Sequence, residues 1–289
     1  MGEAWFYGQS MYHSLLDGSD VELSSELSEA LWNIATGQRS FGPDADPEWT
    51  GWLHYLIWRL AELAEDRPIF ADHSTCITAF MTRYPSGAAL MTRYPTGILE
   101  ELDRDLADDV LATFGRVKLI EKYWHSDFNP TKPVFCNDDP SSGALLLMIK
   151  YLADEDLPAW WRSVITIDNP VWRINLLIWL AGVSSIFLDP TAQPGQLDDY
   201  SGASWHSSDV LNGKYAINGY EPIPFLPAER QQAVCALFRE TLTMETLLTW
   251  VSAFEPLLPL AAPHHYGTVD YLLSAANVCV ADYGLRDIN

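Results

Sequence analysis

Apolar residues recur at spacings of three and four along most of the chain, which is the period of an α-helix with one buried face. In the segment 98–114 an apolar side chain occupies every fourth position, and the segments 228–239, 244–254 and 268–281 carry similar patterns. Patterns typical of strands are scarce. The sequence therefore predicts an all-α protein of about ten or more helices, arranged as antiparallel pairs in a multi-helix domain.

Prolines that follow aspartate or asparagine predict where helices begin. Asp139-Pro140 and Asp168-Asn169-Pro170 each place a side-chain acceptor before a proline in the first turn, where the missing N–H is tolerated. We expect helices at 145–152 and 172–181 to follow them. The apolar run Ile174–Leu188 is interrupted by polar residues and is too short to span a membrane, so it predicts a buried helix.

One short segment leaves the choice between strand and helix open. Val164-Ile165-Thr166-Ile167 is rich in β-branched residues, which favour strands. The helix start at Asp168 follows it at once. The segment is therefore either a short strand or the end of a helix.

The region 188–226 interrupts the helical pattern, because it is rich in Pro, Gly, Asp, Asn and Ser and has no long apolar period. It is too long for an ordinary connection, so we predict a functional loop, an irregular excursion or a small subdomain there. The whole chain, residues 1–289, is predicted to form a single all-helical domain. A subdivision into a helical array at 1–187, the irregular region and C-terminal helices at 227–289 is the alternative.

Two segments resemble each other and also resemble a known repeat. DADPEWTGWLHYLIWRLAEL, from Asp44, and TIDNPVWRINLLIWLAGV, from Thr166, share an acidic residue, a proline, a tryptophan and the tripeptide Leu-Ile-Trp. An Asp-rich turn before a long apolar helix, with Arg173 soon after it, resembles the second helix of a HEAT repeat. The resemblance implies helix pairs stacked on one another, as in an α-solenoid.

The pentapeptide Met-Thr-Arg-Tyr-Pro occurs twice, at 81–85 and 91–95. This step is shorter than the roughly 20–50 residues of a structural repeat, and proline disfavours a continuous helix, so we predict a local duplication at a helix corner. Arg83 and Arg93 could together bind an anion such as a phosphate or carboxylate. Pairing of each arginine with a carboxylate of the chain is the alternative, and it is the one we expect.

The chain carries 39 Asp and Glu against 17 Lys and Arg, a formal net charge of -22. A charge of this sign repels nucleic acids and anionic membranes and attracts basic proteins. Many of the acidic residues lie on the outer face of the helix predicted at 98–114. This face is either simply solvated or docks on a basic partner, and it is the candidate partner-binding face. Its members are Glu100, Glu101, Asp103, Asp105, Asp108 and Asp109.

Candidate residues for metal or acid–base chemistry are few and scattered. Glu121 and His125 lie four apart and could share a helix face. The other candidates are His206, Asp209, His264 and His265. The sequence has no zinc or di-iron spacing, no nucleophile elbow and no phosphate-binding glycine loop, so it assigns no catalytic residue, metal ligand or cofactor.

The four cysteines, Cys76, Cys136, Cys235 and Cys279, lie far apart in the sequence, which predicts free buried thiols in a reducing compartment. The first residues, MGEAWFYGQS, contain no export signal, so we expect a cytoplasmic protein. The 12 tryptophans are expected to pack between helices.

These properties predict an acidic binding protein that captures a basic protein, most concretely an immunity-type inhibitor of a cationic toxin. The alternative is a metal-dependent or acid–base enzyme on an all-helical scaffold, built from the histidine and carboxylate candidates. The absence of a catalytic motif favours the binding protein.

Overall fold

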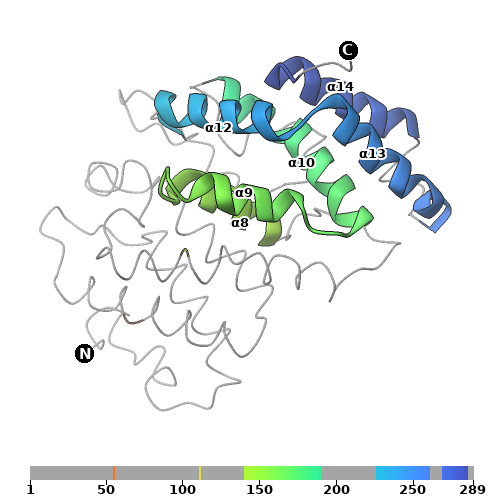
Figure 1. The fold of residues 1–289 in the computed structure, drawn as a ribbon, viewed down its shortest axis with the longest axis horizontal. Helices are drawn as coiled ribbons and strands as arrows, with labels where there is room; N and C mark the ends of the chain where they lie inside the picture. The colour runs from red at the N-terminus through yellow and green to blue at the C-terminus, as the bar shows by residue number, and fades with distance from the viewer. Residues whose placement is uncertain (1–54, 56–110, 112–139, 190–225, 261–268, 286–289) are drawn as a thin grey trace, which may run out of the picture. The chain divides into compact units, whose positions relative to one another are not determined.

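The computed structural model describes residues 140–189, 226–260 and 269–285, together with Tyr55 and Leu111. The three ranges form six α-helices and one 3-10 helix, and no strand occurs in them (Figure 1). All seven elements belong to one compact unit of the chain, which comprises 117–212 and 222–289. The all-α prediction is thereby confirmed for the part of the chain that is described.

In chain order the helices are α8 (Pro140–Tyr151), α9 (Leu157–Ile165), α10 (Pro170–Leu188), α12 (Ala228–Thr241), α13 (Met244–Phe254), the 3-10 helix η3 (Glu255–Leu260) and α14 (Val269–Tyr283). Five residues separate α8 from α9 and four separate α9 from α10, whereas residues 189–227 lie between α10 and α12. Two residues separate α12 from α13, and η3 continues directly from the end of α13.

The predicted helix starts are confirmed. α8 begins at Pro140 and α10 begins at Pro170, each at the proline that the sequence indicated. At α10 the side chain of Asn169 accepts hydrogen bonds from the backbone N–H groups of Val171 and Trp172, at 2.9 and 3.3 Å. These are two of the donors that a helix N-terminus leaves without an intrahelical partner, so Asn169 acts as the N-cap.

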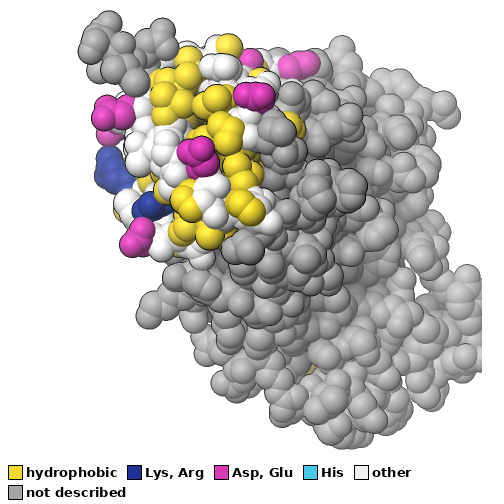
Figure 2. Space-filling view, turned by 90° about the vertical axis from the view of Figure 1, so that its right-hand side faces the viewer, with side chains coloured by type: hydrophobic (Ala, Val, Ile, Leu, Met, Phe, Trp, Pro, Cys, Tyr) yellow, Lys and Arg dark blue, Asp and Glu magenta, His cyan; other side chains and the backbone are white. Residues whose placement is uncertain are grey.

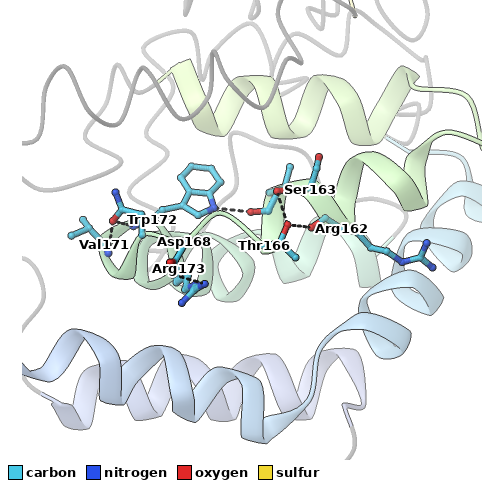
Figure 3. Close-up of polar contacts among 9 residues, drawn as sticks. Arg162, Ser163, Thr166, Asp168, Val171, Trp172 and Arg173 are labelled. Atoms are coloured by element: carbon cyan, nitrogen blue, oxygen red, sulfur yellow. Dashed lines mark hydrogen bonds and ion pairs between the residues drawn. The ribbon is translucent and has the colours of Figure 1, made fainter.

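The open choice at Val164–Ile167 is decided in favour of a helix end. α9 ends at Ile165, and the backbone N–H of Thr166 donates to the carbonyls of Arg162 and Val164. The Thr166 hydroxyl also donates to the Arg162 carbonyl at 2.8 Å (Figure 3). The β-branched residues therefore close a short helix, and the local hydrogen bonds of threonine outweigh its preference for strands.

α10 is the buried centre of the described helices. Most of its side chains are apolar, and residues 174, 176, 177, 179 and 180 have no exposed surface. It packs against α12, α13 and α14, and Figure 1 shows it running beneath them. Its one amide side chain, Asn175, is buried. It donates to the Val171 carbonyl at 2.7 Å, so the buried amide group has a hydrogen-bond partner. The prediction that Ile174–Leu188 forms a buried helix is confirmed.

Candidate binding surface

An aromatic cluster lies where α9, α10, α12 and α14 meet. The ring of Phe238 lies 4.6 Å from Trp161, 5.5 Å from Phe187 and 5.2 Å from Tyr283, measured between ring centroids. The Phe187 ring in turn lies 6.3 Å from Trp179. These separations and the tilted or edge-on orientations are those that aromatic pairs favour. The cluster is therefore a packing core that fixes the helices around it.

The polar atoms of the buried aromatic side chains are satisfied inside the protein. Trp161 Nε1 donates to Thr241 Oγ1 at 2.8 Å, and Trp172 Nε1 donates to the Val164 carbonyl at 2.9 Å. The hydroxyl of Tyr283 donates to the Leu180 carbonyl at 2.6 Å. The prediction that tryptophans pack between helices is confirmed for Trp161, Trp172 and Trp179, which have no exposed surface.

Two of the four cysteines fall in the same core. Cys235 and Cys279 are free and buried, as predicted. Their thiols donate to the carbonyls of Phe187 and Leu177 on α10, at 3.5 and 3.8 Å. Burial raises the pKa of both thiols, although the charge of Arg239 acts in the opposite direction on Cys235. Thiols in this environment stay protonated near neutral pH, so they serve packing and are poor nucleophiles.

An arginine of α12 caps the C-terminal end of α8. Arg230 Nε donates to the Ile149 carbonyl at 2.7 Å, and its Nη2 donates to the Leu152 carbonyl at 2.6 Å. Its Nη1 pairs with the Asp154 carboxylate in the turn that follows. The last carbonyls of a helix have no intrahelical donor and carry partial negative charge, so a cation there is stabilising.

A second arginine of α12 does the same at the end of α14. Arg239 Nε donates to the Tyr283 carbonyl at 2.6 Å. Gly284 has a φ of 64°, and the Leu285 N–H donates back to the Val280 carbonyl at 3.1 Å. This is the Schellman arrangement, in which a left-handed glycine allows the chain to reverse over the last turn. One helix thus supplies charged caps to two others.

The remaining described arginines also bind within the protein. Arg162 of α9 pairs with Glu240 of α12 at 3.2 Å. Arg173 of α10 pairs with Asp168 at 3.1 Å, across the turn that begins α10 (Figure 3). Every described arginine therefore has a carboxylate or a backbone carbonyl of this chain as its partner.

Exposed carboxylates outnumber these internal pairs. Glu155, Glu229, Glu245 and Glu255 are all exposed, and the structure gives their side chains no ion pair with any described residue. Figure 2 shows carboxylate side chains spread over the visible face of the described helices, with basic side chains at one edge only. Within the part of the chain that the structure describes, these four carboxylates are exposed and have no ion-pair partner.

Exposed carboxylates and partly exposed apolar side chains both occur along α13 and η3. Between Glu245 and Glu255 lies the partly exposed Leu248, and Glu255 is followed by an exposed proline, Pro256, and two partly exposed leucines, Leu257 and Leu258. The sequence contains no Lys or Arg between 244 and 285. We call this set the α13–η3 surface.

The α13–η3 surface was not among the sites predicted from the sequence. A stretch that carries Glu and Asp but no Lys or Arg over two helices is a detectable pattern, yet it is weaker than the dense acidic run at 100–109. The partner-binding face was predicted at 100–109 because the acidic residues there are close in sequence, whereas Glu245 and Glu255 are ten positions apart.

The residues predicted to form sites lie outside the described residues. This holds for Arg83, Arg93 and the acidic face from Glu100 to Asp109, and also for all the histidine candidates with Glu121 and Asp209. Their predicted roles stay predictions. Within the described ranges, no group of His, Cys, Asp and Glu is arranged to hold a metal ion. Nor does any helix there have the length and apolarity needed to cross a membrane.

Comparisons of the chain with protein-family models, with curated proteins and with solved structures find no match. A function for the chain must therefore be argued from its own residues. The features available for that argument are the charge balance, the internal pairing of the arginines and the exposed carboxylates beside apolar side chains.

Proposed function

We propose that this protein is an acidic binding protein that captures a basic protein partner, and in its most concrete form an immunity-type inhibitor of a cationic toxin. The observation that carries the proposal is the formal net charge of -22 together with the internal use of the described arginines. The described arginines pair with three exposed carboxylates, those of Asp154, Asp168 and Glu240, and form no ion pair with the other exposed carboxylates among the described residues.

The internal pairing matters because surface charge acts at a distance only where it is uncompensated. In a salt bridge the two charges largely cancel for an approaching molecule, whereas an isolated carboxylate contributes its full field. Among the described residues, four exposed glutamates form no ion pair, namely Glu155, Glu229, Glu245 and Glu255. A field of one sign raises association rates with an oppositely charged partner by roughly 10- to 1000-fold at low salt.

The scaffold suits a binding role. We propose that the stacking of helix pairs extends over the chain as in an α-solenoid, which would give the charge an extended surface. Support comes from the short α12–α13 connection and from the packing of α13 against α14 and of both against α10. The free buried thiols of Cys235 and Cys279 support the further proposal that the protein works in the reducing cytoplasm.

Affinity capture from a lysate of the source organism, with the tagged full chain as bait, tests the proposal. We expect a basic protein to be retained at low salt and released at about 0.5 M NaCl, where the Debye length is well below the ~10 Å found at 0.1 M. Stopped-flow association with the purified partner should slow by about tenfold or more over the same range. The partner's toxic or enzymatic activity should fall as complex forms.

The proposal fails if no basic protein is captured, or if the association rate is independent of salt. Elemental analysis of the purified chain separates it from the enzyme alternative. Stoichiometric zinc, iron or manganese, together with activity that is lost on chelation, would favour a metal site built from the histidine candidates.

A further inference from the structure

We draw no further inference here: the strongest candidate, the side-chain cluster at the N-terminus of α10 that contains the buried Nε of Arg173, carries nothing because Asp168 already pairs with that guanidinium and Asn169 already accepts hydrogen bonds from the first backbone N–H groups of the helix.

Discussion

Replacing Arg230 by methionine should destabilise the protein by about 3 kcal/mol. The change keeps an apolar stem of similar length and removes the guanidinium. That group donates to the Ile149 and Leu152 carbonyls, and its side chain is only 10% exposed. A hydrogen bond from a charged donor contributes about 1.5–3 kcal/mol, and the two carbonyls regain part of this from water. The pair with Asp154, which is 81% exposed, adds no more than about 1 kcal/mol.

Urea unfolding followed by circular dichroism measures the loss, and thermal unfolding should show the midpoint lowered by roughly 6–12 °C, at about 2–4 °C per kcal/mol for a unit of this size. Asp154→Asn is the control, since it removes the exposed ion pair and leaves both carbonyl bonds, so it should cost less than about 1 kcal/mol. Arg230→Lys keeps the charge without the planar fork and should fall between the two. The capping account would be refuted if the free energy of unfolding of Arg230→Met lay within about 0.5 kcal/mol of the wild-type value. It would also be refuted if Asp154→Asn were as unstable as Arg230→Met.

Two further effects on stability follow from the same core. Gly284→Ala places a Cβ at a φ of 64° and should lower the free energy of unfolding by about 1 kcal/mol, as measured in urea. Ala281 lies at an exposed helical position, where alanine is favoured over glycine, so Ala281→Gly is also expected to be destabilising. Burial raises the pKa of Cys279 above that of an unfolded thiol, about 8.5, so between the two values the folded state holds a proton that the unfolded state has lost. Stability should therefore fall as pH rises above about 8.5, with a smaller slope in Cys279→Ala. An unchanged slope in that variant would assign the alkaline loss to other groups such as Tyr283, whose pKa burial also raises.

The helices were predictable where local sequence decides them. α13 has the predicted bounds, 244–254, because Thr243 caps its first turn and the apolar period holds throughout. α10 runs past Ala181, the end of the periodic pattern, to Leu188, the end of the apolar run that was predicted to form a buried helix, and Gly182 and Ser184 are buried within it. α9 was not predicted as a helix, because nine residues show too few turns for a period to be read.

The capping by Arg230 and Arg239 could not be predicted from sequence. Arg230 meets carbonyls some 80 positions earlier in the chain, and Arg239 meets one 44 positions later. Such contacts depend on how α12 packs, and no spacing rule connects an arginine on one helix with the end of another. The expectation that arginines of this acidic chain bind groups within it was made for Arg83 and Arg93, which lie outside the described residues, and for those two it stays a prediction.

Salt should act in opposite directions on the fold and on capture, because the two depend on different charges. The net charge of -22 repels itself in the compact state, and screening relieves that repulsion. The cap by Arg230 is mostly buried and is screened far less than a surface pair. The thermal midpoint should therefore rise between about 0.02 and 0.5 M NaCl, while association with a basic partner slows. A midpoint that falls with NaCl would mean that exposed ion pairs such as Arg162–Glu240 stabilise the fold more than self-repulsion destabilises it. It would then be wrong that the arginines mainly stabilise the fold while unpaired carboxylates dominate the surface charge.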